Sequence, residues 1–465
     1  MSNMMNSLRF LGFLALTGLL IRAAPAAAAV GAEPLPKPNI VLIVADDLGY
    51  ADVGFHGCKD IPTPRLDALA ASSVHCTSGY VTHPFCSPTR AALLTGRYQQ
   101  RFGHENNPKW LPQDDRVGLP RDQTTLADAM RRAGYLTAAV GKWHLGAHPS
   151  FHPNRRGFDV YFGLLGGGHH YFDHNQFKTH PAKAKQEYLI PLVRNETPVE
   201  ESAYLTDALG REAAAFVERT HDKPFFLYLA FNAPHTPLQS PQGYLDRVRG
   251  IADPKLRTYG AMVCGMDDAI GRVLDALKNR GLTQNTLVFF ISDNGGPTGV
   301  TNCRNTPLRG AKGQLYEGGV RVPFLVSWPD RLKPGRFTEP VSSLDIFPTC
   351  LSAAGLGAGG GGAEGARPVS LDGTDLLPHL LGQGKESLVD RPLFWRVGGG
   401  SMSAVRCGSL KWIKVKEQPP ELYHLDADIG EQNDLAGSKP EQAASMQALV
   451  AQWHTGLKQP LWPQP

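Results

Sequence analysis

The 465-residue sequence is poor in several features that mark special classes of protein. Its seven cysteines are too few for a disulfide scaffold. Its 47 Lys and Arg residues nearly balance its 43 Asp and Glu residues, so we expect no nucleic-acid partner. No internal repeat is present and, after the N-terminal segment, no apolar run resembles a membrane-spanning helix. The remaining composition, 42% hydrophobic and 19% charged, excludes a disordered or collagen-like chain.

Residues 1–29 are predicted to be a secretory signal peptide rather than part of the fold. Arg9 precedes a 12-residue apolar run, residues 10–21, that is too short to span a bilayer. Residues 27–29 are alanines and supply the small-residue pattern of a cleavage site. An uncleaved N-terminal anchor is the alternative. The signal peptide predicts an exported protein, periplasmic or secreted, without a stable membrane anchor.

Four apolar runs, each followed by polar residues, predict the core of the fold. Their β-branched and aromatic residues are typical of strands buried on both faces, as in a parallel sheet. Helical spacing lies between the runs, over residues 124–132, 204–219 and 258–280, so we expect an α/β sheet covered by helices. The runs are residues 39–45 before Asp46 and Asp47, 135–141 before Lys142 and His144, 224–231 before Asn232 and His235, and 286–292 before Asp293 and Asn294.

The composition changes near residue 355, where a Gly/Ala tract (residues 355–365) is typical of a surface loop. Beyond it, short strand-like pieces and a helix over residues 440–456 predict a small antiparallel sheet with a terminal helix. We therefore expect a catalytic domain at residues 37–387 and a C-terminal subdomain at residues 388–465. The strand-like pieces are residues 392–397, 410–416 and 421–426.

Acidic residues after two of the predicted strands indicate a metal site. In α/β sheets ligands bind at the carboxyl ends of the strands. Taken alone, Asp46 and Asp47 fit a strand-end turn as well as they fit a metal site. Asp293 and Asn294 follow another strand, which favours the metal site. These four side chains offer only oxygen ligands, which favours Ca²⁺ or Mg²⁺ over zinc.

Residues 85–97 form the most informative segment. Pro88 suits the first turn of a helix, so Cys86 lies at a helix N-terminus, where N–H groups and the helix dipole favour an anion. Arg90 follows one turn later on the same face. A small anionic group over Cys86 would contact both residues. A buried cysteine before an ordinary helix is the alternative for this segment taken alone.

The full set of motifs resembles the type I sulfatase family of the alkaline phosphatase-like superfamily, from about residue 39 to the C-terminus. The resemblance implies a large, mainly parallel sheet covered by helices, plus a small C-terminal antiparallel sheet with a terminal helix. The motifs, in order, are Asp46-Asp47, Cys86-x-Pro88-x-Arg90, Gly-Lys-Trp-His at 141–144, Asn-Ala-Pro-His at 232–235, Asp-Asn-Gly-Gly at 293–296 and Arg-Gly-Ala-Lys at 309–312.

This resemblance also implies the cofactors. Cys86 would be oxidised to Cα-formylglycine by a formylglycine-generating maturation enzyme, and a hydroxyl of the hydrated aldehyde would be the nucleophile. Six cysteines then remain, and their pairing does not follow from the sequence. One Ca²⁺ ion would be held by Asp46, Asp47, residue 86, Asp293 and Asn294.

The roles of the remaining site residues also follow from the resemblance. Arg90, Lys142 and Lys312 would surround the sulfate group and stabilise its charge. The alcohol would leave with a proton from His235 or Lys312, and His144 would accept a proton as the sulfate ester on residue 86 breaks down. Some family members carry a serine where residues 166–171 have none. We expect His169, His170 and Tyr171 to line the rim that binds the alcohol part of the substrate.

The sequence therefore predicts an exported sulfatase that hydrolyses sulfate monoesters of a carbohydrate or an aryl alcohol. A phosphomonoesterase or phosphonate monoester hydrolase of the same superfamily is the alternative enzyme. Phosphate usually requires two metal ions, whereas the predicted ligands support one, which favours sulfate. A non-catalytic sulfated-glycan binder is the alternative outside the enzymes. The sequence makes no prediction of the oligomeric state.

Overall fold

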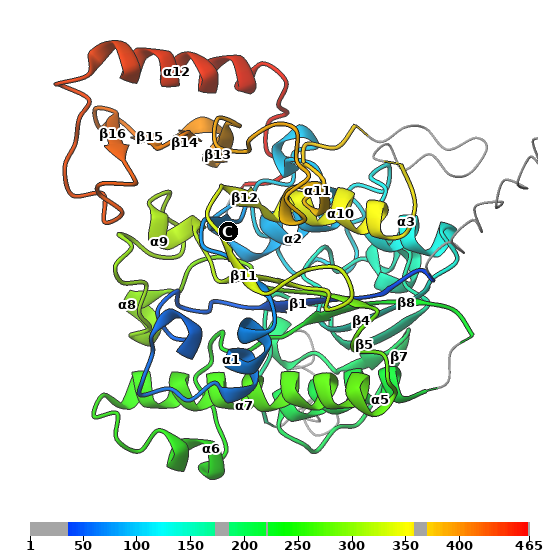
Figure 1. The fold of residues 1–465 in the computed structure, drawn as a ribbon. Helices are drawn as coiled ribbons and strands as arrows, with labels where there is room; N and C mark the ends of the chain where they lie inside the picture. Colours follow the sequence, from blue (N-terminus) through cyan, green and yellow to red (C-terminus); the bar gives the residue numbers. More distant parts are fainter. Residues whose placement is uncertain (1–35, 173–185, 220–221, 358–369, 464–465) are drawn as a thin grey trace, which may run out of the picture. The chain divides into compact units, whose positions relative to one another are not determined.

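The structure is a computed structural model that describes residues 36–172, 186–219, 222–357 and 370–463 (Figure 1). The predicted signal peptide and most of the Gly/Ala tract lie outside the described residues. Residues from Lys37 onward belong to one compact unit, to which the following description applies. Across these ranges, no helix combines the length and the apolar character that crossing a membrane requires.

A ten-stranded mixed sheet forms the centre of this unit, in the order β11-β2-β10-β9-β1-β8-β4-β5-β6-β7. The strands from β9 to β5 are parallel to one another, and antiparallel strands flank them on both sides. The strands are β1 (Asn39–Ala45), β2 (Val74–Cys76), β4 (Leu136–Lys142), β5 (Val160–Leu164), β6 (Val193–Arg194), β7 (Thr197–Pro198), β8 (Phe225–Ala230), β9 (Thr286–Ser292), β10 (Phe324–Ser327) and β11 (Gly335–Phe337).

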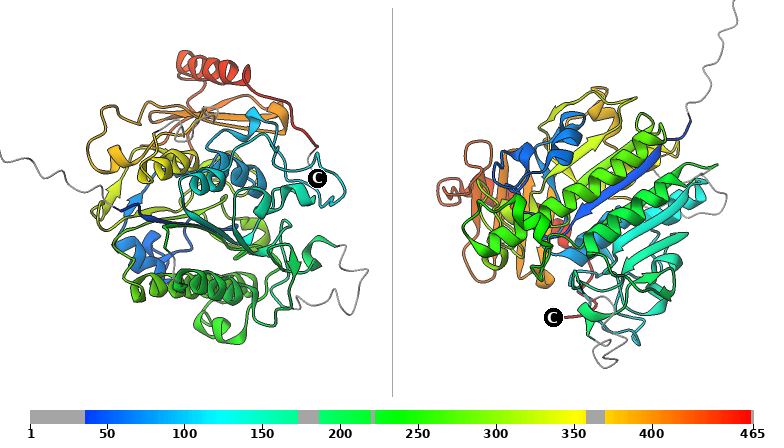
Figure 2. Two further views of the ribbon diagram at one scale, coloured as in Figure 1. Left: turned by 90° about the vertical axis from the view of Figure 1, so that its right-hand side faces the viewer. Right: turned by 90° about the horizontal axis from the view of Figure 1, so that it is seen from below.

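Helices cover both faces of the sheet because its central strands are apolar on both sides (Figures 1 and 2). Along β1, Val41 and Ile43 belong to one core cluster and Leu42 and Val44 to the other, as the two-residue period of a strand requires. The first face packs against α1 (Pro64–Ala71), α5 (Leu205–Glu218) and α7 (Pro254–Asn279), and the second against α2 (Cys86–Thr95), α3 (Leu126–Arg132) and α10 (Ile346–Ala353).

The three predicted helices correspond to α3, α5 and α7. Helix α7 begins at Pro254, four residues before the predicted start. The Asp253 side chain accepts a hydrogen bond of 2.7 Å from the Leu256 N–H, and Pro254 occupies the first helical position, so both residues favour the earlier start. The shorter elements are α6 (Gln242–Arg247), α8 (Thr298–Thr301), α9 (Glu317–Val320), α11 (Leu377–Leu380) and the parallel pair β3 (Gly79–Tyr80) and β12 (Val341–Ser342).

A four-stranded antiparallel sheet follows in chain order, and α12 (Pro440–His454) covers one of its faces (Figure 1). Its other face packs against Tyr80, Leu315 and Val320 of the larger part of the unit. This arrangement and the mainly parallel central sheet confirm the predicted fold class. The strands are β13 (Leu393–Val397), β14 (Met402–Cys407), β15 (Leu410–Val415) and β16 (Glu421–His424).

Candidate active site

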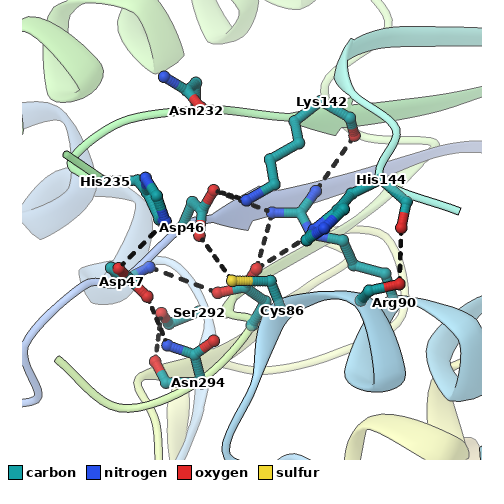
Figure 3. A network of polar contacts seen from close by, with 12 residues as sticks. Asp46, Asp47, Cys86, Arg90, Lys142, His144, Asn232, His235, Ser292 and Asn294 are labelled. Atoms are coloured by element: carbon teal, nitrogen blue, oxygen red, sulfur yellow. Dashed lines mark hydrogen bonds and ion pairs between the residues drawn. The ribbon is translucent and has the colours of Figure 1, made fainter. Parts of the chain in front are cut away.

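The carboxyl ends of β9, β1, β8 and β4 meet at one edge of the sheet because these strands are parallel neighbours (Figure 3). Ala45 of β1 lies opposite Ser292 of β9, so the two acidic pairs emerge side by side. The Asp47 N–H donates to Asp293 Oδ1 at 3.3 Å, and Asn294 Nδ2 donates to Asp47 Oδ1 at 2.7 Å. The predicted oxygen ligands from two distant segments therefore form one cluster.

Cys86 is the first residue of α2 and is buried, as the sequence predicted. Its Sγ lies 3.4 Å from Asp46 Oδ1 and 3.3 Å from Lys312 Nζ. Burial raises the pKa of the Cys86 thiol far above its usual value, so the residue carries no thiolate at neutral pH. All seven cysteines lie within the described residues, and none of them forms a disulfide.

Three cationic side chains pair with the three carboxylates. Arg90 donates from Nε and Nη2 to Asp293 Oδ2, at 3.0 and 2.8 Å. Lys142 Nζ donates to Asp46 Oδ2, and Lys312 Nζ donates to Asp47 Oδ2 at 2.8 Å. Arg90 and Lys142 have side chains with no exposed surface, whereas Lys312 also lines a cavity. In this structure all three cations hold carboxylates.

The carboxylate of Asp46 is held ionised by its neighbours. Burial disfavours the charge, but Lys142, His235 and Arg90 outweigh burial and keep the pKa of Asp46 well below its usual value. An ionised, buried carboxylate at the end of a strand is suited to binding a cation.

Two histidines face the same group of residues. His235 Nε2 lies 3.6 Å from Asp47 Oδ2, and its Nδ1 donates to the Thr236 carbonyl oxygen at 2.7 Å. His144 lines the cavity next to Cys86, and its Nδ1 is buried without a hydrogen-bond partner among the described residues. Burial lowers the pKa of both histidines, so both are neutral proton acceptors at neutral pH.

The donor atoms fit a hard divalent cation. Ligand atoms of Asp46, Asp47, Cys86 and His235 all lie within 4.8 Å of one another. Asn294 Oδ1 is buried and has no hydrogen-bond partner within the described part of the chain. A buried acceptor left open beside three carboxylates matches the all-oxygen coordination that Ca²⁺ prefers.

A cavity of about 270 Å³ opens over Cys86 and is also lined by His144, His235 and Lys312. Gly167 belongs to the loop that the sequence placed at the rim, but the other lining residues were missed because they lie in loops and a short 3-10 helix without a motif. One of them, Asn107, accepts a hydrogen bond of 3.1 Å from the Ser87 N–H and so satisfies a free donor at the start of α2. The missed residues are Asn107, Pro108, Lys109, Trp110, Glu187 and Tyr188.

The structure corrects the expected rim formed by residues 169–171. His169 is fully buried, and its ring nitrogens lie 2.6 and 2.7 Å from the carbonyl oxygens of His170 and Ile190. Tyr171 is also fully buried, with its hydroxyl 2.7 Å from the Asn232 carbonyl oxygen. Buried polar groups require hydrogen-bond partners, and backbone carbonyl oxygens are the partners of both side chains. His170 is half-buried, with Nδ1 at 3.3 Å from Gln239 Nε2.

Comparison with known proteins agrees with this geometry. The Sulfatase family model matches residues 38–356. The mouse N-acetylgalactosamine-6-sulfatase is 36% identical over 96% of this chain and 91% of its own length, and human arylsulfatase A is 35% identical over 91% and 89%. The crystal structure of Ps i-CgsB in complex with k-i-k-neocarrahexaose is 40% identical, with a TM-score of 0.86 over 92% of this chain and 95% of that one.

The matched segment contains every element that contributes to the strand-end cluster of carboxylates and cations. The relatives also extend over nearly the whole chain, including the C-terminal sheet. The chain therefore belongs to the type I sulfatase family and is a sulfuric ester hydrolase.

Proposed function

We propose that this sulfatase is an exported enzyme that hydrolyses sulfate monoesters of carbohydrates by means of a Cα-formylglycine formed from Cys86. The mouse relative's name and the oligosaccharide in the Ps i-CgsB complex support a carbohydrate substrate. The predicted signal peptide at residues 1–29 supports export. We further propose that residues 37–387 form the catalytic domain and residues 388–465 the C-terminal subdomain.

The position of Cys86 is the observation that carries the proposal. Its Sγ lies between a carboxylate oxygen of Asp46 and the Lys312 ammonium group, at the N-terminus of α2. A buried thiol with a raised pKa is a poor nucleophile, and sulfur is a poor ligand for a hard cation. An oxygen atom at this position suits both the oxygen-rich cluster and the chemistry. Conversion of the thiol to a hydrated aldehyde would provide that oxygen.

We assign one Ca²⁺ site to Asp46, Asp47, residue 86, Asp293 and Asn294. When bound, the calcium ion supplies Lewis-acid stabilisation of negative charge, and the hydrated formylglycine supplies the attacking hydroxyl group. Lys142 keeps the carboxylate of Asp46 ionised and oriented, and Arg90 orients the carboxylate of Asp293, whose pKa is raised by burial to about 6. These two cations therefore support the site from behind its ligands.

The residues that line the cavity bind the ester and move protons. Lys312 Nζ lies beside both Cys86 and Asp47, where it can donate to a sulfate oxygen above residue 86. His235 Nδ1 donates to the Thr236 carbonyl oxygen, which leaves Nε2 of the neutral ring as a proton acceptor that faces the ester. The departing alcohol oxygen therefore receives its proton from the Lys312 ammonium group. His144 is neutral because of its burial and accepts the proton that regenerates residue 86.

Phosphomonoester hydrolysis is the competing activity. A phosphate monoester carries more negative charge than a sulfate monoester and usually requires a second metal ion. Lys142 and Lys312 lie against Asp46 and Asp47, so lysine ammonium groups occupy the space beside these ligands. This arrangement favours sulfate.

The test combines mass spectrometry with turnover. The protein is expressed with and without a formylglycine-generating enzyme, and each preparation is assayed with Ca²⁺ on 4-nitrophenyl sulfate and 4-nitrophenyl phosphate. We expect sulfate turnover in proportion to the fraction of residue 86 that has lost sulfur and gained oxygen. Full activity with an intact Cys86 thiol, or a preference for the phosphate ester, would overturn the proposal.

A further inference from the structure

Three consecutive glycines, residues 166–168, leave room for side chains from another segment at the wall of the cavity. The 3-10 helix Glu187–Leu189 lies over them. A Cβ atom on Gly166 would lie 2.7 Å from Glu187 Cγ, and one on Gly168 would lie 2.5 Å from Tyr188 Cζ. The glycines are therefore required for Glu187 and Tyr188 to reach the cavity.

Glu187 lies close to the reacting part of the site. A Cβ atom on Gly167 would lie 2.7 Å from His144 Nε2 and 3.0 Å from Glu187 Oε1, so both groups border the same small space. The Gly167 N–H donates to Glu187 Oε1 at 2.5 Å and fixes the carboxyl group. A carboxylate has about four acceptor positions, of which this bond uses one. The cavity wall thus offers further acceptor positions beside His144.

Glu187 differs from the other carboxylates around Cys86 in its partner. Asp46, Asp47 and Asp293 are each paired with a lysine or arginine, whereas Glu187 is held by a backbone N–H. No step of the proposed hydrolysis uses it. Because Glu187 lines the same cavity as His235, it borders the space that the alcohol part of an ester bound above residue 86 would occupy.

We propose that Glu187 accepts hydrogen bonds from hydroxyl groups of the sugar ring that carries the sulfate, and that its charge disfavours a second anionic group on that ring. The substrate class is then a sulfate ester of an uncharged, hydroxyl-bearing sugar unit. This inference rests on the proposed function. It also replaces the expected role of His169 and Tyr171, which are buried in the backbone of the neighbouring loop.

The test compares Glu187→Gln with the wild type, both with formylglycine at residue 86, on three esters. These are 4-nitrophenyl sulfate, N-acetylgalactosamine 6-sulfate and N-acetylgalactosamine 4,6-disulfate. We expect the ratio of kcat/KM for the monosulfated sugar to that for the aryl ester to fall about tenfold, because a charged acceptor becomes a neutral one. We also expect kcat/KM for the disulfated sugar to rise relative to the monosulfated sugar.

Two further variants distinguish the effect of the Glu187 charge from the effects of its position and of a general change in charge. Glu196→Gln neutralises an exposed carboxylate that pairs with Arg155, and we expect it to leave both ratios as in the wild type. Glu187→Asp keeps the charge but withdraws the carboxylate, so the sugar-to-aryl ratio should fall while discrimination against the disulfated sugar persists. Glutamine can still accept the Gly167 N–H, and thermal unfolding will confirm that the Glu187→Gln fold is retained.

The outcomes are distinct. Wild-type ratios in Glu187→Gln would overturn this inference while leaving the sulfatase proposal intact. Equal changes in Glu187→Gln and Glu196→Gln would also overturn it, because they would show a general effect of charge. Failure of the fully converted wild type to hydrolyse any of the three esters would contradict the proposed function instead.

Discussion

Two clusters of buried charged side chains serve different purposes in this protein. The strand-end cluster consists of Asp46, Asp47, Asp293, Arg90, Lys142 and Lys312, at the carboxyl ends of the central strands. Figure 3 labels Asp46, Asp47, Arg90 and Lys142 of this cluster. The sheet-to-sheet cluster connects α9 with the C-terminal sheet and consists of Glu317, Glu431, Arg321, Arg406, Lys411 and Tyr80.

The sheet-to-sheet cluster satisfies its charges internally. Lys411 Nζ lies 2.8 Å from Glu317 Oε1 and 3.0 Å from Glu431 Oε1. The Tyr80 hydroxyl donates to Glu317 Oε2 at 2.6 Å, and Glu431 Oε2 accepts the Glu317 N–H at 2.7 Å. Such a network holds two parts of the fold in one arrangement.

The strand-end cluster has an equal number of carboxylates and cations but remains open to a ligand. Its Cys86 and Lys312 face a cavity, and the neighbouring Asn294 Oδ1 has no hydrogen-bond partner among the residues described. Burial of charge is common to both clusters and therefore does not identify a site. The adjoining cavity distinguishes the strand-end cluster from the sheet-to-sheet cluster.

The largest expected effect comes from Cys86→Ala in the strand-end cluster. We expect kcat to fall by about 10⁴-fold or more, since the nucleophile is lost. The free energy of unfolding should change by only about 1 kcal/mol, because one buried sulfur atom is removed and α2 keeps its backbone. Turnover of 4-nitrophenyl sulfate and denaturant unfolding measure the two quantities. More than a few per cent of wild-type kcat in this variant would contradict the assignment of residue 86.

Lys411→Met in the sheet-to-sheet cluster should have the opposite profile. The substitution leaves Glu317 and Glu431 buried without their shared cation, and we expect the free energy of unfolding to fall by about 3–5 kcal/mol. Molecules that remain folded should retain kcat to within about tenfold, because the strand-end cluster is unaltered. Urea unfolding and turnover per folded molecule are the measurements.

A double variant is the control for this second prediction. Glu317 keeps its contact with Arg321 when Lys411 is replaced. Lys411→Met combined with Glu431→Gln removes the charge of the other carboxylate, so we expect it to regain part of the lost stability. If the double variant is less stable than Lys411→Met alone, the charge of Glu431 is not the cause of the loss. A change in kcat as large as that of Cys86→Ala would break the distinction between the clusters.

The strong local patterns of the sequence were sufficient to predict the four parallel strands β9, β1, β8 and β4 and the residues that follow them. The apolar runs at 39–45 and 286–292 coincide with β1 and β9, because strands buried on both faces have an unambiguous pattern. Strand β14 has no such pattern. It carries the buried Arg406, whose contacts with Tyr80 come from a segment more than 300 residues away.

The parts of the site that the sequence did not predict depend on tertiary contacts. Glu187 reaches the cavity from a three-residue 3-10 helix and Trp110 from a loop, so no periodicity or motif marks them. Tyr171 has the composition expected of a sugar-binding residue, yet carbonyl groups after β8 bind its hydroxyl inside the fold. A polar or aromatic side chain in a loop can either face a ligand or bind the backbone inside the fold. The positions of the folded backbone groups determine which of the two occurs.

The smallest expected effect concerns a half-buried polar pair that carries no charge and so provides a reference for both clusters. His56 Nδ1 donates to the Tyr50 carbonyl oxygen at 2.6 Å, which leaves His56 Nε2 to accept a hydrogen bond from His75 Nε2 at 2.9 Å. Burial lowers the pKa of His56 to about 3 and that of His75 to about 4.

Because the folded-state pKa of each histidine lies below the unfolded value of about 6.5, the unfolded chain binds protons first. The stabilisation is complete above pH 6.5 and is lost as the pH falls toward 4. His75→Gln retains a donor to His56 but does not titrate. Between pH 7 and pH 5 the free energy of unfolding should fall less in His75→Gln than in the wild type. We expect this difference to be about 1 kcal/mol, a value reduced for the partial exposure of His75. Urea unfolding at the two pH values measures this difference, and parallel curves for wild type and variant would show that the pair does not resist protonation.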